Sequence, residues 1–284
     1  MKNVLIAIAA VAVLAGAGCL YSVAGNFLNG KQIKGSGNLV TKSIPAPDFD
    51  AIHASRGVKV VVSDQAERIG IEADDNLINL VVVEARKGNL VVTIDNQKAR
   101  SIANQHITVT VPANGKIRSL DASSAAKIVA QTPLKADKFA IETSSAATVE
   151  ATVEATSCSM EASSASRIAA TVTATSCSLE SSSAAKIEAA VTASICSVDQ
   201  SSASNIDLSG SAQSLKADLS SAAKLDAAEF TAVNASVDTS SAAAVRLDCS
   251  GELKASASSG SSIRYSGDCR VTANKSSGGS IKKD

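Results

Sequence analysis

The chain has 284 residues, and its 27 basic and 27 acidic side chains give a formal net charge of zero. A neutral chain lacks the excess of lysine and arginine that draws proteins to nucleic acid. Aromatic residues make up 2% of the chain and tryptophan is missing, which removes the stacking platforms of single-strand binders. We therefore expect no nucleic-acid partner, and a sugar site built on aromatic stacking is disfavoured.

The first residues have the pattern of a secretory signal peptide. Lys2 precedes an apolar run from Val4 to Ala15, and small residues follow it. The run is shorter than the roughly 20 residues that a membrane-spanning helix needs. We predict a signal peptide over residues 1–18 and export of the remainder.

Cys19 follows the small residues Gly16-Ala17-Gly18, which resembles a bacterial lipobox, although the usual leucine lies further back at Leu14. The prediction is lipidation at Cys19, with membrane attachment through the N-terminal lipid anchor and location in the periplasm, at the outer membrane or at the cell surface. Plain cleavage near Ser22-Val23-Ala24 and a retained anchor are the alternatives.

Residues 19–34 show little periodicity and are expected to form a tether, followed by a β-rich cap over residues 35–117. Lys87-Gly88 separates two strand-like runs and predicts a hairpin turn. The stretch Ile52–Val60 superimposes without gaps on Leu120–Ile128 and is interpreted as a degenerate first coil. The strand-like runs are Arg68–Glu72, Leu80–Ala85, Leu90–Asp95 and His106–Val111.

One motif recurs through residues 118–284, first as Leu-Asp-Ala-Ser-Ser-Ala-Ala-Lys-Ile over Leu120–Ile128. A fixed period near 19 residues predicts units that stack on their neighbours. Apolar and polar residues alternate inside each unit, which is strand periodicity, so we expect parallel β-helix coils with a corner at Ser-Ser-Ala. The serine pairs begin at Ser123, Ser144, Ser163, Ser182, Ser201, Ser220, Ser240, Ser258 and Ser276.

Three stretches carry a resemblance to a known family: Phe49–Val60, Ile263–Asp268 and Ser276–Ile281, together with Pro112 closing a strand before the repeats. Over roughly residues 35–282 the chain resembles the autotransporter adhesin, head GIN domain family. The resemblance implies an all-β, right-handed parallel β-helix exported from a bacterial cell. The corners differ, since Ser-Ser-Ala stands where Gly-Ser-Gly is usual in that family. Adhesion remains an analogy at this level.

Two groups of cysteines recur along the repeats. Cys158, Cys177 and Cys196 share one repeat position and are expected to stack as small buried hydrophobes. No histidine or further thiol joins them, so we predict no metal and no cofactor there. Cys249 and Cys269 lie one coil apart but two residues out of register. Export permits a disulfide between them, with free thiols as the alternative.

An acidic residue precedes each serine pair by two positions. We expect this column to face water, screened by salt and by a basic column at Lys127, Arg167, Lys186 and Lys224, with a bound divalent cation as the alternative. The serines lack a Gly-x-Ser-x-Gly elbow, so no catalytic residue is predicted. The acidic residues are Asp121, Glu142, Glu161, Glu180, Asp199, Asp218 and Asp238.

These features favour a non-enzymatic, exported cell-envelope protein, either a rigid spacer or an adhesin-like binder of a cell-surface glycan or protein. The alternative is a polysaccharide-active β-helix enzyme, a lyase or glycosidase, which needs a compact cluster of carboxylates. Here the charges are spread one per coil. A water-ordering face with regular Thr-x-Thr rows is disfavoured, because only Thr171-Val-Thr173 fits.

Overall fold

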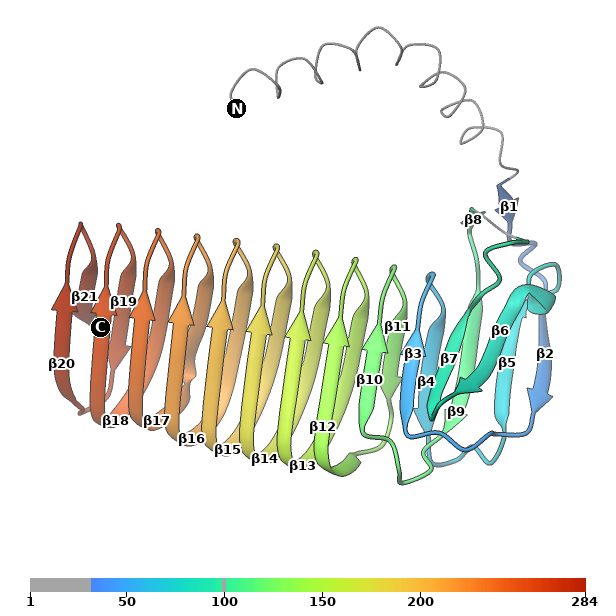
Figure 1. Cartoon of the computed structure of the whole chain (residues 1–284), viewed down its shortest axis with the longest axis horizontal. Coiled ribbons are helices and arrows are strands. Elements are labelled where there is room, and N and C mark those ends of the chain that lie inside the picture. The colour runs from blue at the N-terminus through green and yellow to red at the C-terminus, as the bar shows by residue number, and fades with distance from the viewer. Residues whose placement is uncertain (1–31, 99–100) are drawn as a thin grey trace, which may run out of the picture.

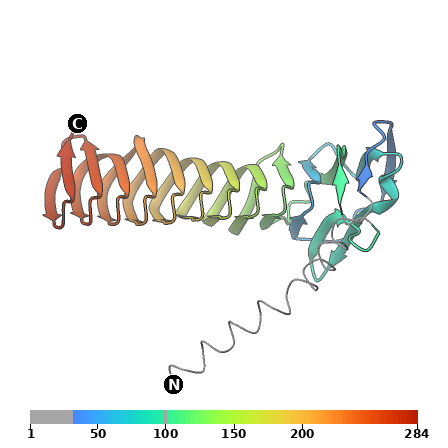
Figure 2. The same ribbon diagram turned by 90° about the horizontal axis from the view of Figure 1, so that it is seen from above.

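The computed structural model describes residues 32–98 and 101–284, so the predicted signal peptide and Cys19 lie outside the described residues. The protein is all-β, with 66% of its residues in strands, and forms a β-solenoid of about 9 turns whose coils are about 19 residues apart. The coils stack into a straight rod with the cap at one end (Figures 1 and 2). The predicted all-β solenoid is confirmed. Within the described ranges no helix is long and apolar enough to cross a bilayer.

Short strands and one 3-10 helix build the end of the rod that precedes the repeats. They are β1 (Ile33–Lys34), β2 (Leu39–Ile44), β3 (Ala51–Ala54), β4 (Lys59–Ser63), β5 (Ile69–Asp74), η1 (Ile78–Leu80), β6 (Val81–Arg86), β7 (Asn89–Ile94), β8 (Ile102–Ala103) and β9 (Ile107–Pro112).

Longer strands build the repeats. They are β10 (Ser119–Ala122), β11 (Lys127–Ala130), β12 (Leu134–Thr143), β13 (Thr148–Ala162), β14 (Arg167–Ser181), β15 (Lys186–Gln200), β16 (Asn205–Leu219), β17 (Lys224–Thr239), β18 (Ala244–Ala257), β19 (Ser262–Ser266), β20 (Arg270–Lys275) and β21 (Ser280–Lys283).

The degenerate first coil predicted from sequence is present. Strand β3 pairs in parallel with β10 so that Ile52 lies opposite Leu120, and β4 pairs with β11. Arg56 and Gly57 have positive φ, like the corner residues of the repeats. The backbone N–H of Gly57 donates to the carbonyl of Ser124, 2.9 Å away, which joins this corner to the next one.

The cap closes the solenoid by switching from parallel to antiparallel pairing. Strands β7 and β9 lie parallel to β3 and β4, and the antiparallel strands β6, β5 and β2 continue the sheet beyond them. The predicted hairpin between β6 and β7 turns at Lys87 and Gly88, both at positive φ. This arrangement covers strand edges that would otherwise be open at this end. Strand β1, inside the expected tether, pairs with β8.

Each complete coil is a flattened loop with two sheets and one tight corner. Strand β13 starts after one Ser-Ser-Ala corner and ends before the next, so the chain reverses inside it, near the unpaired Thr156 (Figure 1). We call the sheet built from residues that follow each corner the post-turn sheet, for example residues 148–153. The sheet built from residues that precede each corner, for example residues 157–162, is the pre-turn sheet.

The corner is a two-residue type I′ turn. Ser124 and Ala125 have φ values of 51° and 61°, and the N–H of Ala126 donates to the carbonyl of Ser123 at 3.1 Å. Left-handed backbone costs about 1–2 kcal/mol for a residue that carries a Cβ. A ladder between coils offsets this cost, since the N–H of Ala125 donates to the carbonyl of Ser145 at 2.9 Å. Serine and alanine thus occupy positive-φ positions where glycine is usual. Hydrogen bonds between successive corners stabilise them there.

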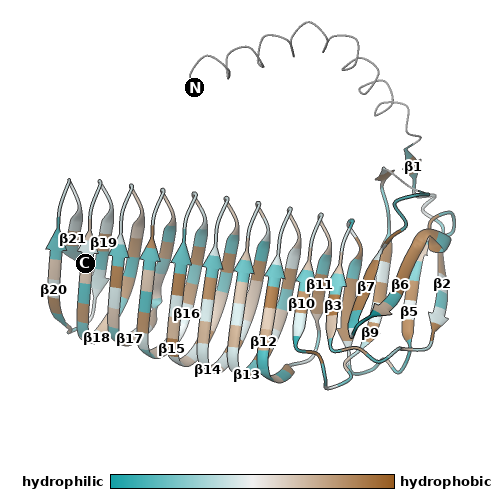
Figure 3. Cartoon of the chain, viewed as in Figure 1, coloured by the Kyte–Doolittle hydropathy of each residue, from teal (hydrophilic) through white to brown (hydrophobic). Residues whose placement is uncertain are grey.

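Side chains between the two sheets form the core in vertical columns. Along β13 the buried residues alternate with more exposed ones within each sheet, and they are Val149, Ala151, Val153, Cys158, Met160 and Ala162. The parallel register places each of these residues over its equivalent in β14. Alternating hydropathy along each coil is visible in Figure 3. The columns through Val149, Cys158 and Met160 are those that the repeat spacing predicts, and the columns through Ala151 and Val153 are additional.

Candidate binding groove

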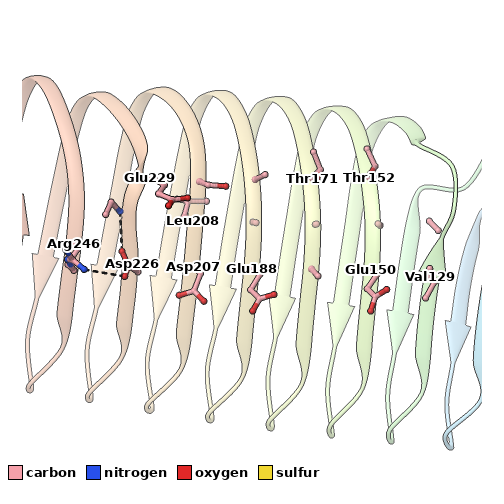
Figure 4. A pocket seen from close by; sticks show the side chains of 18 residues that line it. Val129, Glu150, Thr152, Thr171, Glu188, Asp207, Leu208, Asp226, Glu229 and Arg246 are labelled. Carbon is pink, nitrogen blue, oxygen red and sulfur yellow. Dashed lines mark hydrogen bonds and ion pairs between the residues drawn. The ribbon is translucent and has the colours of Figure 1, made fainter. Parts of the chain in front are cut away.

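A hollow with a volume of about 830 Å³ lies on the outer face of the post-turn sheet. It runs along the rod from Val129 to Arg246, across seven successive coils (Figure 4). Coils in a parallel ladder are about 4.8 Å apart, so the groove is on the order of 30 Å long. Its length along the axis suits an extended polymer better than a compact small molecule.

The hollow lies over a column of mostly small inward side chains. Ala151, Ala170 and Ala189 occupy this column in three successive coils, with the bulkier Ile168 and Val172 in the neighbouring inward columns. Leu208 takes the same position in the next coil, so the hollow coincides with alanines over part of its length. The outward residues beside this column are also small, for example Ala190.

A row of carboxylates lies along the groove on the side nearer the corners, at Glu150, Glu188, Asp207 and Asp226 (Figure 4). Glu150, Glu188 and Asp207 have cation partners nearer the corner, whereas Asp226 pairs with Arg246 at the same position of the next coil. Lys127 Nζ lies 2.6 Å from Glu150 Oε1, and Lys186 Nζ lies 2.6 Å from Glu188 Oε1 and 2.9 Å from Asp207 Oδ2. The row is therefore a charge-balanced wall rather than an anionic patch.

The lysine contacts favour the ionised forms of Glu188 and Asp207. The hydrogen bond from Lys186 lowers the pKa of Glu188, helped by the neighbouring Arg167 guanidinium, and the same bond raises the pKa of Lys186. Burial opposes ionisation of Asp207, but hydrogen bonds from Lys186 and Asn205 outweigh it and lower its pKa. Carboxylates with lowered pKa values and fixed partners are poor proton donors, and they remain hydrogen-bond acceptors at neutral pH.

A β-bulge marks one end of the groove. The register between β16 and β17 shifts after Asp207, so that Glu229 lies opposite Ser209. Asp226 accepts a hydrogen bond from the N–H of Ala228 at 3.3 Å, which stabilises the bulged segment. Among the described residues Glu229 forms no ion pair, and it projects near the end of the groove (Figure 4). Bulges of this kind often reorient side chains at binding surfaces.

The basic column was predicted to screen the acidic column that precedes the corners, and this is wrong. Lys127, Arg167 and Lys186 pair with Glu150, Glu188 and Asp207 in the groove wall, because these lie on the same outward face of the post-turn sheet. The predicted acidic column lies on the pre-turn sheet, around the corner.

That acidic column forms an in-register ladder from Asp121 to Asp238, with most members exposed to solvent, as expected. Two of its members have charged partners: His53 Nδ1 lies 2.6 Å from Asp121 Oδ2, and Lys216 Nζ lies 2.8 Å from Asp218 Oδ2. Over residues 32–98 and 101–284 no group of three or more histidine, cysteine or acidic residues is placed to hold a metal ion.

The predicted cysteine stack is present. Cys158, Cys177 and Cys196 are register partners in β13, β14 and β15, are at most 3% exposed and are not bridged. Burial raises the pKa of Cys196 to about 12, as expected for a thiol that serves as a small hydrophobe. Cys249 and Cys269 are also present as thiols and lie in neighbouring coils.

Sequence reasoning did not find the groove. The signal was available as a column of small residues two positions after the carboxylate row, at Thr152, Thr171, Ala190 and Ser209. Recognising a hollow also required knowing that alanines lie inward beneath that line, which depends on where the chain reverses.

A family model described as "Putative auto-transporter adhesin, head GIN domain" matches residues 48–190 and 167–269. No curated protein matches the chain.

Solved bacterial structures share the fold. A putative adhesin from Parabacteroides merdae ATCC 43184 is 22% identical, with a TM-score of 0.66 over 89% of this chain and 99% of that one. A putative adhesin from Parabacteroides distasonis ATCC 8503 is 19% identical, with a TM-score of 0.67 over 89% and 100%. A structure from the same strain, named as a putative lipid binding protein, is 17% identical, with a TM-score of 0.63 over 89% and 100%.

Proposed function

The chain belongs to the auto-transporter adhesin head GIN domain family, and from that premise we propose that it is an exported, non-enzymatic, adhesin-like protein. Its ligand is an extended cell-surface glycan or protein segment that lies along the groove of the post-turn sheet. The observation that carries the proposal is the groove itself, about 830 Å³ in volume, open along the rod and continuous over seven coils.

The chemistry of the wall supports binding rather than turnover. Glu150 and Glu188 present ionised oxygens whose positions are fixed by lysines, and such oxygens accept hydrogen bonds from hydroxyl or amide groups of a ligand. A glycosidase needs one carboxyl group held protonated opposite a second one. The lowered pKa values of Glu188 and Asp207 are opposite to that requirement.

Filling the groove tests the proposal. Ala190 is exposed and lines the groove, so Ala190→Trp should block it without disturbing the core. Thr175 is exposed near the chain reversal, outside the groove, and Thr175→Trp is the matched control. We expect Ala190→Trp to weaken binding at least tenfold on glycan arrays and in cell-binding assays, whereas Thr175→Trp binds like the wild type. Equal binding by both variants would refute the groove as the site.

The same preparations should be screened for polysaccharide depolymerisation. Binding without product formation is expected. Release of oligosaccharides by the wild type, lost on substitution of Asp207 or Glu229 at the bulged end, would favour the enzyme alternative and overturn the non-enzymatic proposal.

We further propose that the exported chain is anchored to a membrane through lipidated Cys19, which the lipobox-like sequence before it supports. Metabolic labelling with palmitate should mark the wild type, and Cys19→Ala should abolish the label and release the protein from membranes. An unlabelled wild-type protein would contradict the anchor and leave the groove proposal unaffected.

A further inference from the structure

Cys249 and Cys269 lie in adjacent coils at the end of the rod opposite the cap. Cys249 belongs to β18 and is fully buried, and Cys269 immediately precedes β20 and is partly exposed. Register pairs bracket them, because Asp248 lies opposite Ser266 and Glu252 lies opposite Arg270. Between these two register pairs each coil contributes three residues, 249–251 and 267–269. The two cysteines therefore lie in facing three-residue segments at the chain reversal.

Glycines occupy the positions across from the two cysteines. By count between the brackets, Cys249 faces Gly267 and Cys269 faces Gly251. A Cβ on Gly267 would come within 2.2 Å of the carbonyl oxygen of Cys249, which shows how closely the two backbones approach there. Because neither glycine has a side chain, no side chain at these two positions separates the Cys249 side chain from that of Cys269. The two-residue offset seen in the sequence is therefore compatible with contact.

Burial raises the pKa of Cys249 to about 11, and the neighbouring Cys269 thiol adds to this shift. The Cys249 thiol also lies 3.5 Å from the carbonyl oxygens of Val233 and Glu252, which hold its sulfur in this segment. We propose that Cys249 and Cys269 form an intramolecular disulfide that fastens the last coil to its neighbour. The proposal goes beyond the groove and does not depend on what the groove binds.

Cys269 reacts first, because it is partly exposed to an oxidant whereas Cys249 is buried. The Cys269 sulfur, as thiolate after losing its proton to water, attacks a disulfide oxidant such as oxidised glutathione or an oxidised thiol–disulfide oxidoreductase. One oxidant thiol leaves, and a mixed disulfide remains on Cys269. Cys249 then attacks the Cys269 sulfur and its proton goes to the second leaving thiol. Two protein thiols are oxidised, and one oxidant disulfide is reduced to two thiols.

The disulfide has a structural purpose at this end. Within the described residues β20 pairs only with β18, and β21 pairs only with β19, so these strands have one partner each. Strands with one partner are the ones that fray first. A covalent link between residues 249 and 269 restrains that opening. The stacked trio of Cys158, Cys177 and Cys196 is no substitute, because all three are buried away from an oxidant and their in-register side chains run parallel.

The test is thiol counting and peptide mapping on the full-length chain, isolated from the cell envelope and, separately, treated with oxidised glutathione. Free thiols are alkylated under denaturing conditions and peptides are identified by mass spectrometry without reduction. We expect one cross-linked peptide pair containing Cys249 and Cys269, with two thiols lost per chain. The matched control Cys196→Ala should form the same pair, whereas Cys269→Ser should form none.

Thermal unfolding distinguishes a disulfide between Cys249 and Cys269 from a contact between two free thiols. Dithiothreitol should lower the unfolding midpoint of the wild type by several degrees and leave that of a Cys249→Ser/Cys269→Ser variant unchanged. Alkylation of both cysteines in the oxidised wild type, or a persistent glutathione adduct on Cys269, would overturn the proposal. Peptide mapping of the wild type decides the question even if a variant fails to fold.

Discussion

The buried hydroxyl of Ser166 lies 2.9 Å from the hydroxyl of Thr143 in the preceding coil. Ser166 also donates to the carbonyl of Thr143 at 2.9 Å and accepts from the N–H of Ser163 at 3.1 Å, so it fastens one corner to the coil before it. The same arrangement recurs at Thr239 and Ser261, whose hydroxyls are 2.9 Å apart. Buried polar residues inside this core thus occur as matched pairs in adjacent coils.

Removing one hydroxyl of such a pair should lower the free energy of unfolding more than removing both hydroxyls. Ser166→Ala leaves the Thr143 hydroxyl without its partner, and we expect a loss of about 1–3 kcal/mol in the free energy of unfolding. The double variant Thr143→Val/Ser166→Ala replaces both hydroxyls and should lose less, since Ala122 and Ala147 form the equivalent apolar pair one coil earlier. Urea unfolding of both single variants and the double variant measures the coupling. Additive losses would contradict the pairing.

Gln200 is the exception to this pairing. It is 1% exposed, and its Nε2 donates to the carbonyl of Lys224 at 3.1 Å, but its Oε1 finds no hydrogen-bond partner. The residue that would supply a hydroxyl in the next coil is Ala223. Because a buried unpaired acceptor is costly, we expect Gln200→Leu to raise the free energy of unfolding by roughly 1 kcal/mol.

Leucine fits this position, since Leu219 occupies the same column in the next coil. The exposed Gln213 provides the control, and Gln213→Leu should leave the unfolding curve unchanged. A destabilised Gln200→Leu variant would mean that the hydrogen bond to Lys224 outweighs the unpaired oxygen.

The repeat period was enough to predict the solenoid because equivalent positions of successive repeats hold residues of one kind, either apolar or polar. Ile128, Val149 and Ile168 recur at one position, and any chain that repeats in this way must stack those residues. The corner was also predictable, since a serine pair followed by alanine, or by glycine in the last two copies, interrupts the alternation of strand residues.

The groove and its wall were not predictable in the same way. Whether Lys127 meets Glu150 or Asp121 depends on which side of the corner each outward column faces. The groove column is the less regular of the two in sequence, because Ala169 interrupts it. The bulge at Glu229 is signalled only by a coil of 20 residues between coils of 19 and 18 residues. Size differences between inward alanines and valines, which coincide with the groove over part of its length, matter only once the two sheets are in contact.

The corners provide a third prediction, because alanine at positive φ is strained. Ala184 has φ 60° at the second position of its type I′ turn, where glycine has no steric cost. Ala184→Gly should raise the free energy of unfolding by roughly 0.5 kcal/mol, after the larger entropy of the unfolded glycine chain is subtracted from the relief of strain.

Ala184→Val should do the opposite and cost about 1–3 kcal/mol, because a β-branched residue fits the left-handed region poorly. Thr192→Val, on an exposed strand position, controls for added hydrophobicity. Thermal and urea unfolding of the three variants check the order. If Ala184→Val were as stable as the wild type, the turn would not have this conformation in solution.

The pair of His53 and Asp121 predicts a pH dependence of stability at the cap. The hydrogen bond to Asp121, 2.6 Å long, raises the pKa of His53 above its ordinary value of 6.5, although partial burial opposes the shift. A histidine with a raised pKa in the folded state stabilises that state fully below pH 6.5, and the contribution is lost as the pH rises through the raised value. The free energy of unfolding should therefore fall between about pH 6 and pH 8.

His53→Asn should abolish most of this dependence, and His106→Asn should preserve it, since His106 is the only other histidine and its side chain is 62% exposed. Urea unfolding at several pH values, with each variant compared at the same ionic strength, measures the slope. Because Asp121 begins the carboxylate ladder of the pre-turn sheet, the protonated imidazole also offsets repulsion from Glu142 in the next coil. A slope unchanged in His53→Asn would place the titrating group elsewhere and show that this contact contributes nothing to joining cap and solenoid.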